Sequence, residues 1–236
     1  MRVRISGITV LLAIGYLLLT SSAHAQLRPR VALDLAMGIP VGQFADNLGH
    51  PGFGFRLMGA AQFGATPVQV GLDIGYLIYG FERRTEPFST TIPDVNVRVE
   101  TTNNIALSHL FFRLQPPTGR VQPYVEGLIG FAYLFTSTSI KDIGSDEDVA
   151  SSTNFDDFTA SYGAGAGVDF HLGSSTSETG RTTSFLLHAG VQYLLGGNAE
   201  YLKRGSIRRE NGQVTFDVQR SRTDLVAPQL GVTFVF

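Results

Sequence analysis

The chain has 236 residues, no cysteine and a formal net charge of −2 at pH 7. Without cysteine it has no disulfide scaffold, no cysteine-ligated zinc and no thiol nucleophile. The near-neutral charge argues against a basic nucleic-acid-binding protein, and the charged fraction of 16% with 17 phenylalanines argues against disorder. A β-rich globular protein or a membrane protein remains.

Residues 1–25 have the pattern of a secretory signal peptide. Two arginines within the first four residues precede an uncharged apolar stretch from Ile5 to Leu19, and Ala23-His24-Ala25 forms a small-x-small cleavage site. An uncleaved membrane anchor is disfavoured, because the apolar stretch is shorter than the roughly 18–20 residues that a spanning helix needs. We therefore predict export from the cytoplasm and a single mature domain of residues 26–236.

After the leader, apolar residues alternate with polar or very small ones. From Phe158 to His171, for example, apolar residues from Phe158 to Phe170 alternate with Thr, Ser, Gly, Asp and His. Side chains two residues apart share one face of a strand, so each such stretch predicts a strand with one apolar face. The eight predicted strands are 30–39, 53–63, 68–81, 100–114, 123–135, 158–172, 183–195 and 222–236.

The connections between these strands alternate in length. Short connections at 64–67, 115–122 and 173–182 are rich in Gly, Pro, Ser and Thr, which favours turns. The long connections are 40–52, 82–99, 136–157 and 196–221. Long loops at one end and short turns at the other predict an all-β fold, an eight-stranded antiparallel up-and-down β-barrel.

Alternation alone leaves open which face of the barrel points outward. A soluble eight-stranded barrel is apolar inside, whereas a membrane barrel is apolar toward lipid. The predicted polar face is rich in glycine, which suits a narrow interior, and the only lysines, Lys141 and Lys203, lie in long connections. A charge that faces lipid at mid-depth destabilises by about 2–4 kcal/mol, so the strand charges should point into a polar lumen. These charges are Asp34, Arg56, Asp73, Arg113, Glu126 and Asp169.

The last predicted strand ends in a recognisable pattern. Gln229 is followed two residues later by Gly231, Phe234 is antepenultimate and Phe236 is terminal. This pattern resembles the C-terminal assembly signal of bacterial outer-membrane proteins. Together with the leader and the eight strands, it makes the chain similar to small outer-membrane β-barrels of the OmpA/OmpX type. The resemblance implies a bacterial outer-membrane location, surrounding lipid and lipopolysaccharide, and the outer-membrane assembly machinery as a partner.

Charged residues near the short turns form candidate sites in the lumen. Arg113 and Glu126 flank one short connection, and Asp169, His171 and His188 flank the next. Clustered carboxylates and histidines can perform acid–base chemistry or bind a metal. However, an eight-stranded lumen is just wide enough to be filled by its own side chains, and buried charges need partners. We therefore predict a structural plug, with no catalytic residue, metal or cofactor.

Two of the long connections are strongly charged. Residues 141–157 carry six acids and one lysine, but the order of an EF-hand calcium loop is missing, because Ser151 stands where glycine is required after Asp146. The last long connection is basic and contains Asn211-Gly212, which predicts a tight hairpin. Its arginines are candidates for contact with lipopolysaccharide phosphates or with the acidic loop, and ordinary solvation is the alternative. The candidate contact residues are Lys203, Arg204, Arg208 and Arg209.

Three classes of function are compatible with this sequence. The first is a monomeric barrel with a structural, adhesion or surface-interaction role through its four long loops. The second is a narrow channel for small solutes. The third is a lipid-modifying enzyme, which is disfavoured because no serine on a late strand is spaced from a histidine as in outer-membrane lipid A-modifying enzymes. We predict the first, a protein without enzymatic activity that binds no nucleic acid.

Overall fold

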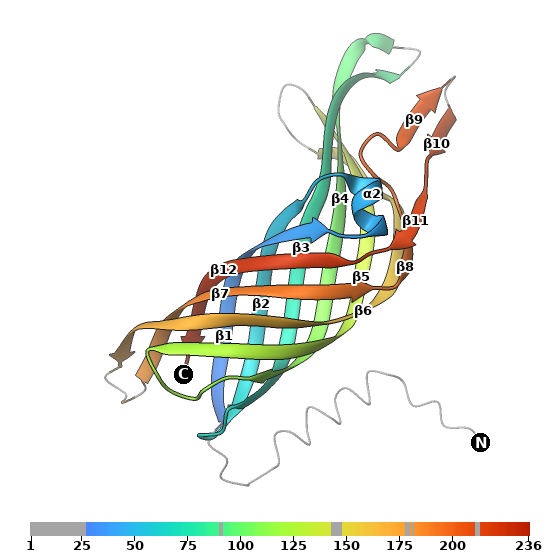
Figure 1. Ribbon diagram of the computed structural model, residues 1–236. Coiled ribbons are helices and arrows are strands. Elements are labelled where there is room, and N and C mark those ends of the chain that lie inside the picture. The colour runs from blue at the N-terminus through green and yellow to red at the C-terminus, as the bar shows by residue number, and fades with distance from the viewer. Residues whose placement is uncertain (1–26, 90–91, 143–147, 178–179, 181, 211–212) are drawn as a thin grey trace, which may run out of the picture.

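The computed structural model describes residues 27–89, 92–142, 148–177, 180, 182–210 and 213–236. Eight strands form one closed antiparallel barrel, in which consecutive barrel strands pair and β12 closes onto β1 (Figure 1). The predicted up-and-down barrel is therefore confirmed, while the predicted leader lies outside the described residues. The barrel strands are β1 (Leu27–Pro40), β2 (Gly52–Phe63), β3 (Val68–Ser89), β4 (Ile92–Leu114), β5 (Val121–Asp142), β6 (Asp148–Thr176), β7 (Thr182–Gly196) and β12 (Leu225–Val235).

The four central strands are much longer than the sequence predicted. Residues 82–99 and 136–157 were expected to be loops, but β3–β4 and β5–β6 continue as paired strands through most of them. The described parts of these strands within residues 82–101 and 136–157 rise above the barrel as a tall curved sheet, called here the extension (Figure 1). Above the barrel neither face of a strand has to be apolar, so the period-two signal disappears while the strand persists.

The first and last long loops carry short elements that cover the same end of the barrel. Helix α2 (Gln43–Leu48) follows β1, and β8 (Asn198–Tyr201) pairs with β11 (Gln219–Arg222). Strands β9 (Ile207–Glu210) and β10 (Gln213–Phe216) pair as the predicted hairpin, whose turn residues lie outside the described chain. No helix among the described residues is long and apolar enough to cross a membrane.

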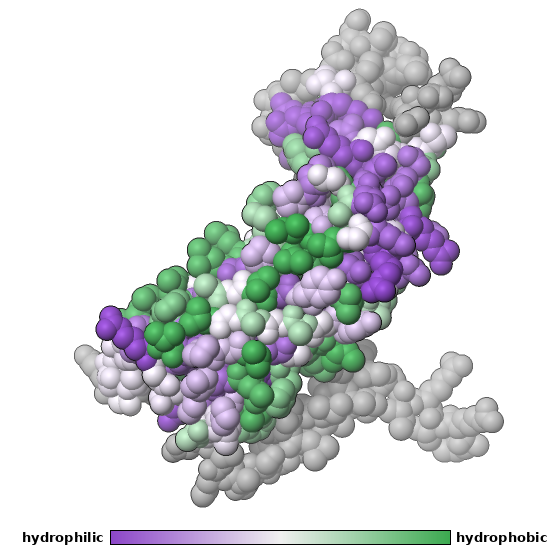
Figure 2. All heavy atoms as spheres, in the orientation of Figure 1, coloured by the Kyte–Doolittle hydropathy of each residue, from purple (hydrophilic) through white to green (hydrophobic). Residues whose placement is uncertain are grey.

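The two faces of the barrel wall differ sharply in polarity. Outward-facing Leu35, Leu110 and Ile129 are 74%, 65% and 68% exposed, although they are large and apolar. On the same strands, inward-facing Asp34 and Arg113 are 1% and 0% exposed. Apolar residues are spread over the barrel exterior, whereas hydrophilic residues gather on the extension (Figure 2). Apolar side chains facing outward and charges facing inward match the requirements of lipid.

The upper half of the lumen, toward the long loops, is filled by apolar side chains. Leu134 and Leu194 from the wall are about as buried as Phe44 of α2, which enters from above. The Phe44 ring packs edge-to-face on Tyr201, with ring centroids 5.1 Å apart. Elements outside the barrel wall therefore complete the core at this end.

Candidate functional site: a polar network in the lumen

The lower half of the lumen, toward the short turns, holds most of the predicted interior charges. Arg113 and Glu126 are direct partners in the β4–β5 register. Arg113 Nε and Nη2 lie 2.8 Å and 2.7 Å from Glu126 Oε2, and both side chains are fully buried. The Arg113 guanidinium also lies over the Tyr124 ring, 3.9 Å from its centroid. The adjacent strand β5 thus supplies both an ion pair and a cation–π contact to the same arginine.

A second arginine is held between two carboxylates. Arg56 Nε donates to Asp73 Oδ2 at 2.6 Å, and Arg56 Nη1 donates to Asp34 Oδ2 at 2.9 Å. The three residues come from β2, β3 and β1, which are neighbours in the wall. All three face the lumen because they occupy the inward positions of their strands.

A third group joins a histidine to a carboxylate and a phenol. Asp169 and His188 are direct partners in the β6–β7 register, and Asp169 Oδ1 lies 2.7 Å from His188 Nδ1. The other ring nitrogen, His188 Nε2, lies 3.2 Å from the Tyr124 hydroxyl. Both nitrogens of the imidazole are therefore used, which holds the ring in one orientation.

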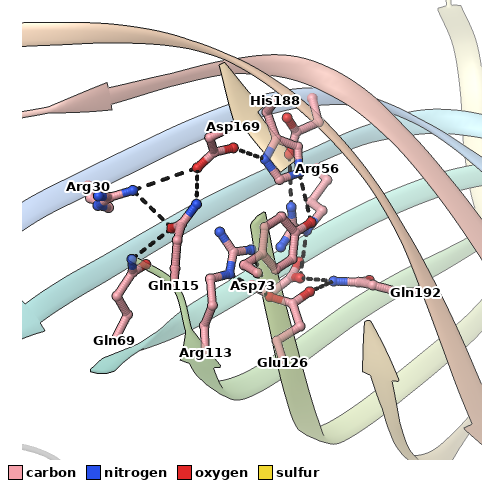
Figure 3. A network of polar contacts seen from close by, with 12 residues as sticks. Arg30, Arg56, Gln69, Asp73, Arg113, Gln115, Glu126, Asp169, His188 and Gln192 are labelled. Atoms are coloured by element: carbon pink, nitrogen blue, oxygen red, sulfur yellow. Dashed lines mark hydrogen bonds and ion pairs between the residues drawn. The ribbon is translucent and has the colours of Figure 1, made fainter. Parts of the chain in front are cut away.

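Glutamines connect these groups into one continuous network (Figure 3). Gln192 Nε2 lies 2.9 Å from both Asp73 Oδ2 and Glu126 Oε1, and so bridges opposite parts of the wall. At the lower end, Gln115 Nε2 donates to Asp169 Oδ2 at 2.8 Å, and Gln115 Oε1 accepts from Arg30 Nη1 at 3.0 Å. The network therefore runs from the short-turn end to the middle of the barrel.

Charges in this network nearly cancel. Its three arginines face four carboxylates, with His188 as a further titratable group. Removing one partner of a buried pair leaves an uncompensated charge and destabilises by about 3–5 kcal/mol. Such a network holds the strands of the wall together in one arrangement.

His171 does not join this network, contrary to the expectation from sequence. Its ring is only half-buried at the rim, where Nε2 lies 3.0 Å from Ser174 Oγ. His171 still pairs in register with Leu186 and keeps the inward parity of Asp169, but it lies at the open end of the lumen, beyond the described members of the network.

Sequence reasoning missed several members of the network, namely Arg30, Gln69, Gln115, Tyr124 and Gln192. Arg30 shares strand parity with Asp34, and Gln192 shares it with His188, so alternation places both in the lumen. Their partners were not predictable in this way, because Gln192 and Asp73 are 119 residues apart in the chain.

Glycines on the inner wall make room for the network. A Cβ at Gly165 would lie 2.8 Å from Glu126 Oε1 and 3.0 Å from Gln192 Cγ. A Cβ at Gly231 would collide with the backbone of β1 at Leu33 and Asp34. The glycine-rich inner face is thus required by packing.

The residues of the C-terminal pattern divide between the two faces of β12. Gln229 is buried and Gly231 faces Asp34 in the lumen. Phe234 packs edge-to-face on Phe185 of β7, with centroids 5.6 Å apart, and Phe236 is exposed.

Of the basic loop residues, Lys203 and Arg204 lie between β8 and β9 at the long-loop end. Lys203 is half-buried and Arg204 is exposed. Arg208 and Arg209 belong to β9, but their side chains lie outside the described part of the structure. The loop contacts the extension, because Glu82 Oε2 accepts a hydrogen bond from the Gly205 amide at 3.0 Å.

One close serine–histidine pair was not expected from the sequence. His109 Nε2 lies 2.9 Å from Ser161 Oγ, and both side chains are buried above the network. Within the described residues, no carboxylate is hydrogen-bonded to His109, and the apolar upper core separates the pair from solvent. Nor do the described residues contain a cluster of three metal-ligating side chains. The pair therefore lacks the acid and the access of a hydrolase site.

Between the polar network and the apolar upper core lies a cavity of about 20 Å³. Arg56, Asp73 and His109 line it below, and Leu77 and Leu107 line it above. This space suits about one water molecule. Side chains fill the lumen on both sides of it. The protein is an eight-stranded transmembrane β-barrel.

No protein-family model and no curated protein matches the chain. Among solved structures, it is similar to Neisserial surface protein A, at 13% identity over 89% of this chain and 95% of that chain, with a TM-score of 0.35. Ail of Yersinia pestis, crystallised with the heparin analogue sucrose octasulfate, is 15% identical over 89% and 97%, with a TM-score of 0.34. A major outer membrane protein of Thermus thermophilus is 13% identical over 89% and 100%, with a TM-score of 0.35.

Proposed function

We propose that this protein is a plugged barrel of the bacterial outer membrane whose long-loop end acts in surface interaction or adhesion. It reaches this membrane after export and cleavage of residues 1–25. The observation that carries the proposal is the filled lumen, in which Arg113, Met58 and His188 are fully buried. Because its own side chains fill the lumen, the exposed ends of the barrel are the parts that can bind partners.

The extension supports a role at the long-loop end. Strands β3 to β6 continue well beyond the register in which the other barrel strands pair, and the β9–β10 hairpin stands beside them (Figure 1). Arg84 Nη1 donates to the Ile207 carbonyl at 3.3 Å, which links the hairpin to this sheet. A long ordered sheet outside the membrane offers a large polar surface for recognition.

The alternative function is a narrow channel, and conductance separates it from the proposal. The purified barrel should show no single-channel conductance in a planar bilayer, because the network and the apolar core both block the lumen. Leu134→Phe narrows the upper core further and should close any accidental gap in its packing. Conductance steps that persist in this variant would therefore come from a true channel and would contradict the plug.

The surface role is tested by shortening the extension without opening the barrel. Glu82 and Thr101 are register partners, so residues 83–100 can be replaced by an Asn-Gly turn. Cells that display this variant should adhere less to matrix-coated wells than cells displaying the intact barrel. Replacing residues 208–215 by the same turn between the partners Ile207 and Phe216 gives a matched control for the other projection. Equal adhesion of all three proteins would exclude both projections.

We further propose that the basic loop contacts lipopolysaccharide phosphates. Changing Lys203, Arg204, Arg208 and Arg209 together to glutamine should weaken the binding of purified lipopolysaccharide, because charge-assisted hydrogen bonds to phosphate are lost. An Arg220→Gln/Arg222→Gln variant removes two exposed arginines of β11, outside the four candidate positions, and serves as the control. Unchanged lipopolysaccharide binding by the loop variant would contradict this contact and show that the basic side chains are merely solvated by water.

The assembly machinery is a proposed partner through Phe234 and Phe236. Deletion of Phe236 should reduce the amount of heat-modifiable, membrane-inserted protein in cells, because the last strand would lose its terminal aromatic. The variant Phe236→Tyr keeps an aromatic ring and should insert normally. Full insertion of the deletion variant would contradict this role.

A further inference from the structure

A hollow of about 570 Å³ opens at the short-turn end, below the polar network. Its walls come from the start of β1, the β4–β5 turn and the lower ends of β6 and β7. Arg28, Arg30, Arg120 and His171 line it, and its lining contains no carboxylate side chain. The volume lies within the roughly 300–1,000 Å³ of small-molecule sites. We call this hollow the cationic mouth.

Arg30 forms the buried floor of the cationic mouth. It is 2% exposed, and its Nη1 and Nη2 donate to the neutral amides of Gln115 and Gln122 at 3.0 Å and 3.2 Å. Its Nε has no hydrogen-bond partner among the described residues. Asp169 lies 3.6 Å from Arg30 Nη1, but both Asp169 oxygens already accept hydrogen bonds, from Gln115 and His188.

The outer arginines of the mouth, unlike Arg30, have no carboxylate near them among the described residues. Arg28 is half-buried and Arg120 is exposed, and in the described part of the chain neither forms an ion pair with a carboxylate. Deeper in the lumen the situation is different, since Arg56 has two carboxylate partners and Arg113 has one. The excess positive charge is therefore confined to the mouth.

We propose that the cationic mouth binds a phosphate group. Guanidinium groups present paired donors that match phosphate oxygens, and a partly enclosed site strengthens such charge-assisted hydrogen bonds. The Gln122 side chain and the Ser184 hydroxyl supply further polar groups on the lining. Apolar Leu172 and Val235 lie on the rim, where the barrel wall ends and lipid headgroups begin. The phosphate belongs either to a phospholipid headgroup or to a soluble phosphate compound.

Calorimetric titration of the refolded barrel in a non-ionic detergent tests this site. The two probes are inorganic phosphate and dihexanoyl phosphatidylglycerol. Both Arg28→Gln and Arg120→Gln leave the buried network intact, and folding of the double variant is checked by heat-modifiable migration. Affinity should fall at least about tenfold, because each lost charge-assisted hydrogen bond is of that order. An Arg220→Gln/Arg222→Gln variant changes net charge equally at the opposite end, at exposed positions of β11, and should bind like the unmodified barrel.

Each outcome of this titration is decisive. Binding of inorganic phosphate with no gain from the lipid supports a soluble phosphate ligand, and tighter binding of the lipid supports a headgroup. Absence of binding by either probe to the unmodified barrel would overturn the proposal. Equal affinities of the unmodified barrel and the Arg28→Gln/Arg120→Gln variant would also overturn it. None of these results depends on adhesion by the extension, so the two proposals fail separately.

Discussion

The two halves of the lumen are filled according to different physical rules. The lower half is closed mainly by charged and amide side chains from the strands themselves, with Met58 and Phe111 packed among them and Gln192 joining Asp73 to Glu126 across the space. The upper half is closed by apolar side chains, including residues of α2 and β8 that enter from outside the wall. Polar groups at this end are bonded in pairs or short chains, as when the Tyr79 hydroxyl donates to the Leu202 carbonyl at 3.0 Å.

This difference shows what each half requires. Hydrogen bonds and ion pairs depend on direction, so the lower half tolerates only one arrangement of its partners. Apolar packing depends chiefly on volume, so the upper half can be built from any elements that fill it.

The largest effect is expected from breaking the buried pair in the lower half. Arg113→Met should lower the free energy of unfolding by about 3–5 kcal/mol, because Glu126 remains buried without its partner. Combining it with Glu126→Gln should destabilise less than the sum of the single changes, since no uncompensated charge is left. Urea unfolding from lipid vesicles measures all three variants. Additive effects, together with measurable conductance, would indicate a hydrated pore instead of a plug.

In the upper half, Leu134→Ala should destabilise by about 2–5 kcal/mol through lost burial and a residual cavity. Leu134 is 1% exposed and belongs to no polar network. The losses of unfolding free energy from Leu134→Ala and Arg113→Met should therefore add in the double variant. Urea unfolding from lipid vesicles measures this sum. Strong coupling between the two sites would show that the halves act as one unit.

On the outer wall, the addition of a charge should destabilise the barrel, whereas in the lumen the removal of a charge does so. Leu187→Arg should destabilise by about 2–4 kcal/mol, because this outward residue of β7 faces lipid at depth. Thr153→Arg is the matched control, since Thr153 is exposed on the extension part of β6. Equal unfolding midpoints for both variants would reverse the assignment of the inner and outer faces.

The smallest effect concerns pH and the extension. Hydrogen bonds and ion pairs from Lys141 and Arg83 hold the pKa of Glu100 below its ordinary value. Glu100 therefore stabilises the folded state above the unfolded pKa of about 4.3, and this contribution is lost as pH falls through the lower folded pKa. Glu100→Gln should remove this part of the acid dependence, measured as protease resistance of the extension between pH 5 and pH 3, conditions spanning the ordinary Glu pKa of about 4.3. An unchanged pH profile would show that Glu100 contributes nothing there.

Much of this protein was determined by local sequence alone. Period-two alternation specifies strands and places Asp34, Arg56 and Asp73 on the polar face, and the cost of a charge facing lipid then assigns that face to the lumen. The Arg113–Glu126 pair was also predictable, because a short turn brings the inward positions of its two strands together. The hairpin around residues 211–212 followed from Asn-Gly chemistry, and the register of β9 with β10 agrees with it.

Other features were decided only by tertiary structure. The faces of the strands do not say which residues meet across the lumen, because that depends on the tilt and stagger of the closed barrel. Gln192 therefore reaches Asp73, 119 residues away, and His109 meets Ser161, 52 residues away, without a local signal. The extension was missed because strands in water need no apolar face. His171 was misplaced because alternation gives the face of a residue and not its depth, and His171 lies at the open end of the lumen.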